Sequence, residues 1–198
     1  MTDPTFEYRE HDLQEDLWVA IDFETATGDA TSACALGLAV VERGVVRETR
    51  SWLIQPPANE YHWFCMRVHG ITPEDTAQSP EFDEVWPEIA PYIESGRLLA
   101  HNAPFDGRVL RALLVKFELP KPKAALVCTV DMSRAALSHL SDHKLGTVCE
   151  ACGIPLNHHE AESDAYACAR VALACAEEAG TASIADAVDA LGVVWRRL

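Results

Sequence analysis

Residues 17–25 read Leu-Trp-Val-Ala-Ile-Asp-Phe-Glu-Thr, an apolar run that ends in two acids separated by one residue. An uninterrupted run from Leu17 to Ile21 is typical of a central strand that is covered on both faces of its sheet. Side chains alternate between the two faces of a strand, so Asp22 and Glu24 point the same way. The run therefore predicts the centre of a sheet and a pair of carboxylates that could share a cation.

Four further segments have the apolar patterns of strands, which gives an expected sheet of five strands: 33–41, 45–54, 97–101 and 126–129. The first two are joined by Glu42-Arg43-Gly44, a link typical of a hairpin, so the sheet opens with antiparallel neighbours. Helical patterns follow from Asp106 and, in the last third of the chain, over 130–137, 144–152, 161–179 and 184–191. This order predicts an α/β fold with a mixed sheet and helices on both faces.

Residues 55–80 interrupt this regular pattern. Prolines and Gly70 predict irregular structure there, a helix is expected to begin after Ser79, and Pro87 and Pro91 are expected to kink or split that helix. Three large side chains in the segment could stack on a base, but burial is the commoner use of such residues and is expected for them: Trp63, Phe64 and Met66.

The length and charge of the chain limit what it can be. Its 198 residues suffice for one well-buried core and are too few for two comfortable domains. Residues 1–16 have the acidic, anchor-poor composition of a disordered leader, so 17–198 is expected to form a single domain. Acids outnumber bases by 31 to 16, for a net charge of −15. That balance excludes a broad phosphate-binding surface, so any contact with nucleic acid has to be small or mediated by metal ions.

The sequence carries no signal for a membrane. No run approaches the roughly 18 uninterrupted apolar residues of a membrane span. The first 16 residues are acidic, where a secretory signal would be basic and then apolar. We therefore expect a cytoplasmic protein with no membrane partner. Its seven cysteines, an odd number scattered through apolar surroundings, are expected to be mostly reduced and buried.

Two of these cysteines allow a second interpretation. Cys149 and Cys152 form a C-x-x-C pair close to His158 and His159, which invites a zinc site. The same thiols also continue the i, i+3, i+4, i+7 apolar stripe of the helix expected over 144–152, and no second ligand pair follows at the spacing of a zinc finger. The helical period accounts for both thiols without a metal, so core packing is favoured.

Four acids lie at the ends of apolar elements rather than on a solvated face. Asp106 follows a strand-to-helix turn and Asp164 lies near the start of a helix rich in small residues, so both could converge with Asp22 and Glu24 at the carboxyl end of the first strand. Four carboxylates would offset two Mg²⁺ or Mn²⁺ ions, the arrangement that phosphoryl chemistry uses. A neutral histidine beside them, such as His159, could accept a proton from water.

These residues form three motifs in a recognisable order. Asp22-Phe23-Glu24-Thr25, then His101-Asn102-Ala103-Pro104-Phe105-Asp106, then His159 with four residues before Asp164, resemble the motifs of the DEDDh exonucleases. That family includes the proofreading subunit of the bacterial replicative DNA polymerase and the oligoribonucleases. The resemblance runs from about Leu17 to Ala179, and His69-Gly70-Ile71-Thr72 is similar to a further family segment near the terminal nucleotide.

The resemblance implies a ribonuclease H-like fold and magnesium-dependent removal of nucleoside 5′-monophosphates from the 3′ end of single-stranded DNA or short RNA. It implies His159 as the general base and Asp22 as the bridge between two ions. The implied metal ligands are Asp22, Glu24, Asp106 and Asp164. The implied contacts of the last one or two nucleotides are Phe23, Thr25, His69, Asn102 and Phe105, whose aromatic rings offer stacking faces.

The third motif departs from a simple match. His158 is adjacent to His159 and could serve as the base, although the family's spacing selects His159. Glu160 and Glu162 add negative charge, and either in place of Asp164 would shift the motif's register.

Two other functions stay open at this level. The chain could be a non-catalytic nucleic-acid or polymerase-associated module on the same fold, or it could hydrolyse another phosphodiester. His101 could be a buried, hydrogen-bonded histidine or a substrate contact. Residues 193–198, apolar and then basic, could dock on the body, on a second copy or on a partner such as a polymerase.

Overall fold

The computed structural model describes residues 17–94 and 96–198. The predicted acidic leader, residues 1–16, lies outside the described residues. Within them the chain forms a sheet of six strands in the order β3-β2-β1-β4-β5-β6. The strands are β1 (Leu17–Thr25), β2 (Ala33–Glu42), β3 (Val45–Leu53), β4 (Arg97–Ala100), β5 (Ala125–Cys128) and β6 (Arg196–Arg197). β1 is antiparallel to β2 and parallel to β4, so the sheet is mixed and β1 is central, as expected.

The expectation of five strands is wrong because of β6. This strand pairs antiparallel with the edge strand β5, with Leu126 opposite Arg196 and Ala125 opposite Arg197. Two residues are too short to show an alternating pattern, so the sequence contains no strand signal at this position. The chain is guided there by the indole ring of Trp195, which stacks on that of Trp18 at a centroid distance of 5.3 Å.

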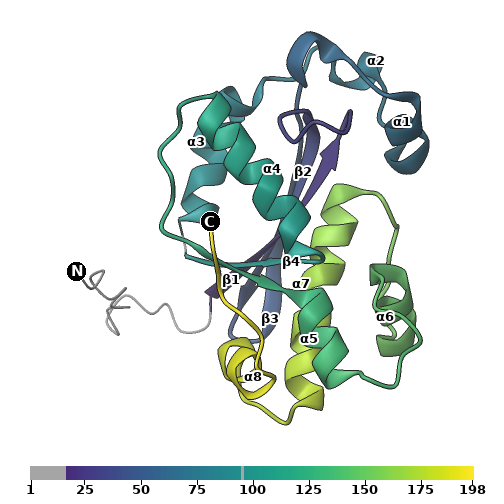
Figure 1. The fold of residues 1–198 in the computed structure, drawn as a ribbon, viewed down its shortest axis with the longest axis vertical. Helices are drawn as coiled ribbons and strands as arrows, with labels where there is room; N and C mark the ends of the chain where they lie inside the picture. Colours follow the sequence, from purple (N-terminus) through teal and green to yellow (C-terminus); the bar gives the residue numbers. More distant parts are fainter. Residues whose placement is uncertain (1–16, 95) are drawn as a thin grey trace.

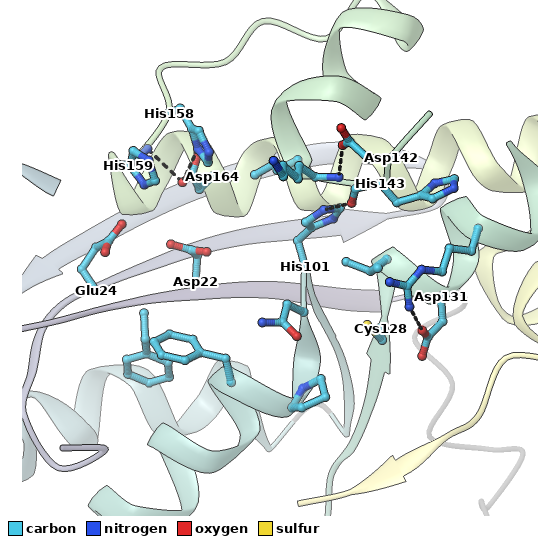
Figure 2. Close-up of a pocket in the computed structure, with 18 of the residues that line it drawn as sticks. Asp22, Glu24, His101, Cys128, Asp131, Asp142, His143, His158, His159 and Asp164 are labelled. Atoms are coloured by element: carbon cyan, nitrogen blue, oxygen red, sulfur yellow. Dashed lines mark hydrogen bonds and ion pairs between the residues drawn. The ribbon is translucent and has the colours of Figure 1, made fainter. Parts of the chain in front are cut away.

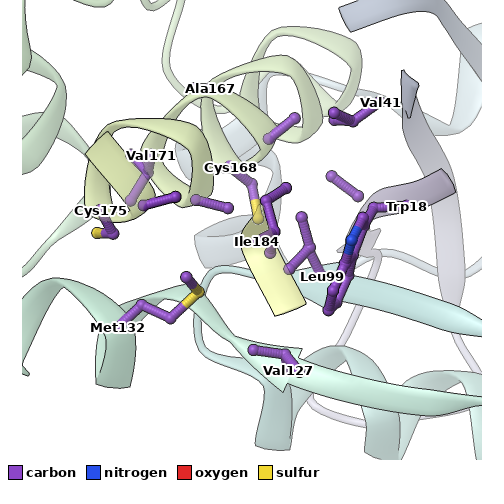
Figure 3. Close-up of a cluster of buried hydrophobic side chains, with 14 of the residues drawn as sticks. Trp18, Val41, Leu99, Val127, Met132, Ala167, Cys168, Val171, Cys175 and Ile184 are labelled. Carbon is purple, nitrogen blue, oxygen red and sulfur yellow. The ribbon is translucent and has the colours of Figure 1, made fainter. Parts of the chain in front are cut away.

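Helices cover both faces of the sheet, as predicted (Figure 1). One face carries α5 (Thr129–Ala136), α6 (Leu145–Cys152), α7 (Ala161–Glu178) and α8 (Ile184–Ala190). The other carries α3 (Phe82–Ile93) and α4 (Ala103–Lys116). Along β1, Trp18 and Ala20 face the first cluster, and Val19 and Ile21 face the second. Figure 3 shows Trp18, Leu99 and Val127 of the strands against the small side chains of α7.

Local structure differs from expectation between residues 55 and 116. The segment expected to be irregular holds η1 (Pro57–Asn59), α1 (Trp63–His69) and α2 (Pro73–Thr76). Helix α3 is not split by Pro87 and Pro91, because it buries Trp86 and Ile89 and this packing outweighs the lost backbone bonds. Helix α4 begins before Asp106, since a proline is tolerated in a first helical turn.

Cys149 and Cys152 pack as part of the apolar stripe of helix α6. Cys149 is 1% exposed in the core below α6, and Cys152 packs against the same cluster. Among residues 17–94 and 96–198, no cysteine belongs to a group of side chains close enough to share a metal ion. Every cysteine of the chain is described there and is a free thiol. The core interpretation is therefore confirmed. In the same part of the chain, no helix combines the length and hydropathy needed to cross a bilayer.

The start of α7 lies directly on strand β2. A Cβ atom added to Gly37 would lie 1.8 Å from the carbonyl oxygen of Ala161, the first residue of α7. Gly37 is also the register partner of Asp22 across the β1–β2 ladder. Only the absence of a side chain at Gly37 lets the helix approach this closely, and the approach brings the first turn of α7 beside the acidic end of β1.

We expect Gly37→Ala to lower the free energy of unfolding by about 2 kcal/mol or more, because backbone atoms of α7 would have to move away from the sheet. Urea denaturation measures the change. Gly146→Ala is the matched control, since a Cβ atom there meets nothing within 4 Å inside helix α6. The control should be neutral or slightly stabilising. Equal stability of the Gly37→Ala protein and the original would contradict this packing.

Candidate active site

Three carboxylates from two distant segments meet at the end of β1. Asp22 and Glu24 belong to β1, and Asp164 belongs to the first turn of α7. One oxygen from each of the three lies within 4.8 Å of the others. Figure 2 shows the three side chains turned toward one another, at the border between the strand and the helix. The strand period and the contact of α7 with β2 thus bring together three of the four acids that the sequence singled out.

Asp106 reaches the same region from behind the strand. Its Oδ1 accepts a hydrogen bond from the backbone N–H of Phe23, over 3.0 Å, and the residue is 1% exposed. It is not one of the three residues whose oxygens lie within 4.8 Å, nor one of those that line the adjacent cavity. Its charge nevertheless helps to raise the pKa of Asp22, which is raised first of all by burial. Of the four predicted ligands, the structure therefore clusters three and places the fourth as a buried neighbour.

Burial and neighbouring charges raise the pKa values of three of these acids, Asp22, Glu24 and Asp106. Burial, followed by the charges of Asp106, Asp164 and Glu24, raises the pKa of Asp22 well above its usual range. Burial, followed by the charges of Asp164 and Asp106, raises the pKa of Glu24 to about 8, and burial raises that of Asp106 to about 7. Such a group of buried oxygen donors is unfavourable when charged and fits hard divalent cations, which would replace the protons.

Two adjacent histidines flank Asp164. Nδ1 of His158 lies 3.1 and 3.2 Å from the two carboxylate oxygens, and the backbone N–H of His159 donates to Oδ2 over 3.0 Å. Their rings stack with centroids 3.9 Å apart. Burial, followed by the neighbouring His158, lowers the pKa of His159. The ring contact of His158 with Asp164 was not anticipated, because the sequence gives only its adjacency to the motif.

The two other acids near this motif are engaged elsewhere. The Glu162 carboxylate accepts hydrogen bonds from the hydroxyl groups of Thr49 and Ser51 on β3. The Glu160 carboxylate accepts one from the side chain of Asn157. Neither belongs to the clustered oxygens, so in this geometry Asp164 keeps the position that the motif assigns to it.

A cavity of about 650 Å³ opens beside the carboxylates. Of the predicted nucleotide contacts, Phe23, Asn102 and Phe105 line it. Thr25 and His69 do not: Nε2 of His69 lies 3.3 Å from the carbonyl oxygen of Thr25, and its Nδ1 accepts from a backbone N–H. The structure therefore pairs these two residues with each other, next to the cavity rather than in it.

Two open questions from the sequence have structural answers. Nδ1 of His101 lies 2.9 Å from the Thr129 hydroxyl and its Nε2 lies 3.0 Å from the His143 carbonyl oxygen. Burial lowers the pKa of His101 to about 4, so it is a neutral, hydrogen-bonded histidine in the cavity wall. The expectation that Trp63 and Phe64 are core is wrong, since each is 58% exposed on the short helix α1.

One side of the cavity wall consists of residues that the sequence motifs do not include. Its residues come from α5, from the loop before α6 and from β6, and include Asp131, Arg134, Asp142, Lys144 and Arg196. None of them belongs to a motif or to an apolar period. The one sequence feature that could have indicated this part of the wall was the basic composition of residues 193–198.

The chain matches a known protein family over most of its length. Residues 19–172 match the family model RNase_T, described as exonuclease. The PolC-type DNA polymerase III of Thermotoga maritima is 30% identical over 159 residues, covering 79% of this chain and 12% of the polymerase. That of Bacillus cereus is 28% identical over 157 residues, covering 78% and 11%. The chain thus spans about an eighth of the length of these relatives.

Solved structures share the fold. Exonuclease X in complex with 5′ overhanging duplex DNA is 23% identical with a TM-score of 0.70, covering 88% of this chain and 99% of that one. The nuclease domain of 3′hExo, a DEDDh family member bound to rAMP, is 18% identical with a TM-score of 0.69, covering 82% and 92%. Escherichia coli exonuclease I, in a zinc-bound complex with single-stranded DNA, is 17% identical with a TM-score of 0.73, covering 82% and 41%.

A mixed sheet flanked by helices, with acids gathered at the end of its central strand, is the ribonuclease H-like fold that these solved structures share. The extent of the family match then makes the assignment specific. This chain belongs to the exonuclease family that the RNase_T model describes.

The raised pKa of Glu24 predicts a pH dependence of stability in the absence of metal. A folded state that binds a proton more tightly than the unfolded state gains stability at low pH and loses that gain as the pH rises through about 8. With a chelator present, the melting temperature should fall between about pH 6.5 and pH 8.5. The histidines with lowered pKa titrate below this range, so they do not contribute to the fall.

Glu24→Gln is the variant that isolates this effect. Over the same pH range, its melting temperature should fall by about 3 °C less than that of the original protein, or by a still smaller amount. Adding Mn²⁺ at the upper pH should raise the melting temperature of the original protein more than that of the variant. Parallel pH profiles for the two proteins would show that the carboxylates do not repel one another as the structure indicates.

Proposed function

We propose that the protein is a cytoplasmic two-metal-ion 3′-to-5′ exonuclease that hydrolyses the terminal phosphodiesters of single-stranded DNA or short RNA to nucleoside 5′-monophosphates. The observation that carries the proposal is the meeting of Asp22, Glu24 and Asp164 within 4.8 Å, at one side of a cavity of nucleotide size. Membership of the exonuclease family supports it.

Asp22, Glu24 and Asp164 would hold Mg²⁺ or Mn²⁺, with Asp106 adding a fourth negative charge behind them. When bound, two such ions activate water on one side of the phosphorus and stabilise the leaving oxygen on the other. Asp106 also accepts the backbone N–H of Phe23, which fixes the strand segment that carries Asp22 and Glu24. Four carboxylates balance the charge of two divalent cations, which explains why so many acids occupy so small a volume.

His159 is the candidate general base. Its backbone N–H is bound to Asp164, so the ring is held beside the carboxylates. Its lowered pKa keeps the ring neutral at physiological pH, the form that accepts a proton. Within the described residues no hydrogen bond occupies the His159 ring nitrogens, whereas Nδ1 of His158 already faces Asp164. This difference favours His159 over His158.

The substrate is the 3′ end of a strand. Phe23, Asn102 and Phe105 would contact the last nucleotide inside the cavity, and Thr25 and His69 would do so from its edge. Several neighbours of the same fold are described in complex with DNA or with rAMP, which supports a nucleic-acid substrate. The net charge of −15 favours short strands, or 3′ ends delivered by a partner. The similarity to PolC-type DNA polymerases supports a polymerase as that partner. A second copy of this chain is the alternative partner.

Product analysis tests this function. Labelled DNA and RNA oligonucleotides of graded length, incubated with Mg²⁺, should lose nucleoside 5′-monophosphates stepwise from the 3′ end. Circular and 3′-phosphorylated strands should resist, because the reaction needs a free 3′ end. Absence of product from every strand would indicate a non-catalytic module, and cleavage of circles would indicate hydrolysis of another phosphodiester.

Loss of one central carboxylate should abolish turnover. We expect Asp22→Asn to lower kcat by about a thousandfold or more, because this side chain lies among all the other acids. The far-UV circular dichroism spectrum should be unchanged. Asp83→Asn, which removes an exposed carboxylate from α3, is the control and should keep full activity. Hydrolysis by Asp22→Asn at the original rate would end the proposal.

The two histidines should differ in their effect on rate. His159→Ala is expected to lower kcat about a hundredfold or more, the usual contribution of a general base. His158→Ala, which removes a ring contact of Asp164, is expected to cost less than about tenfold. Single-turnover rates with saturating metal compare the two. The reverse ranking would assign the base to His158, and two unchanged rates would exclude a histidine base.

A further inference from the structure

The cavity continues past the carboxylates to a wall of opposite charge. Figure 2 shows Glu24 and His159 at one end and Asp131 and Asp142 at the other, with His101 between them. Three cations line the far end, which we call the cationic end: Arg134 of α5, Lys144 before α6, and Arg196 of β6.

Two of the cations are arranged around a single acid. Nη2 of Arg196 lies 2.6 Å from Oδ2 of Asp131, and Nη1 of Arg134 lies 3.6 Å from its Oδ1. One carboxylate cannot neutralise two guanidinium groups, and each guanidinium has five N–H donors of which Asp131 takes few. The side chains of Arg134 and Arg196 are 65% and 32% exposed, so donors stay accessible to a ligand. Asp131 therefore orients the pair without cancelling its charge.

Lys144 adds to this excess. Its backbone N–H donates to Asp142 over 3.0 Å, and in the part of the chain that the structure describes its ammonium group forms no ion pair. The cationic end thus has three positive side chains against the carboxylates of Asp131 and Asp142. In a chain with a net charge of −15, such a local excess beside a cluster of acids is a marked polarity within one cavity.

We propose that the cationic end is a second phosphate subsite, which binds an internucleotide phosphate on the 5′ side of the bond that is cut. The inference rests on the proposed exonuclease function, because it uses the direction of a strand whose last nucleotide lies near Phe105 and Glu24. Guanidinium groups match phosphate geometry with paired N–H donors, and an ammonium group supplies a point charge. The carboxylate end offers such a phosphate no donor of this kind.

The subsite also gives a role to the end of the chain. Arg196 is positioned by the pairing of β6 with β5 and by the stacking of Trp195 on Trp18. The indole N–H of Trp195 donates to Asp189 over 3.2 Å, which adds a tie to α8. The terminal segment therefore contributes a substrate contact in addition to closing the edge of the sheet.

The test compares strands of different length. The double variant Arg134→Gln/Lys144→Gln changes two exposed cations of the cationic end, and Arg47→Gln/Lys121→Gln is the control with the same change of charge outside the cavity. KM is measured with Mg²⁺ for a dinucleotide, which has the scissile phosphate alone, and for a hexanucleotide. The unsubstituted protein should have a lower KM for the hexanucleotide than for the dinucleotide. In the double variant, the ratio of the dinucleotide KM to the hexanucleotide KM should be roughly tenfold smaller. The control should keep the ratio.

A second readout separates specific contact from general attraction. The slope of log KM for the hexanucleotide against log salt should decrease by about 0.7 for each lost phosphate contact. Arg196→Gln should act in the same direction, with its melting temperature measured because Arg196 also ties β6 to Asp131. The proposed subsite would be overturned if the KM ratio stayed unchanged in both the double variant and Arg196→Gln. It would also be overturned if the control variant lost as much of the ratio as the double variant. Either result would leave the proposed exonuclease function standing. Failure of the unsubstituted protein to hydrolyse either strand would instead overturn the proposed function.

Discussion

The repulsion among closely spaced carboxylates at the end of β1 is the constraint on which the rest of the structure depends. One oxygen from each of Asp22, Glu24 and Asp164 lies within 4.8 Å of the others, and burial adds to the cost of charging Asp22 and Glu24. Such a cluster persists only when the surrounding fold holds it in place. The core on both faces of β1 supplies that rigidity, and a divalent cation, the ligand that the proposed function assigns to the site, would turn the repulsion into attraction.

Helix α7 links packing to chemistry. Its small residues pack closely on the sheet, and its first residue lies against Gly37, whose register partner is Asp22. Glu162 in its first turn is bound to β3, so the hairpin also helps to fix the helix start. Any change that lifts this helix end moves Asp164 and the histidines bound to it. Stability and activity are therefore coupled at one contact between a helix and a strand.

The net charge of the whole chain and the local charges of the cavity affect the binding of nucleic acid in different ways. A net charge of −15 disfavours long-range attraction of nucleic acid. Within the cavity, one end holds the clustered acids, and the other holds three cations beside Asp131 and Asp142, which leaves an excess of positive charge there. Recognition that relies on a few local contacts is compatible with an acidic surface, whereas recognition along a duplex is not.

The sequence by itself determined the central strand, the helices on both faces and the acids that meet beside β1, because periodicity and strand ends are local properties that a short segment displays. Only the tertiary structure decided the pairing of Arg196 and Arg197 as a sixth strand within the described residues, the exposure of Trp63, and the contact of His158 with Asp164. A two-residue strand has no period, and contacts between distant or differently oriented side chains depend on how elements pack. The cationic end of the cavity, gathered from three separate elements around Asp131, belongs to the same category.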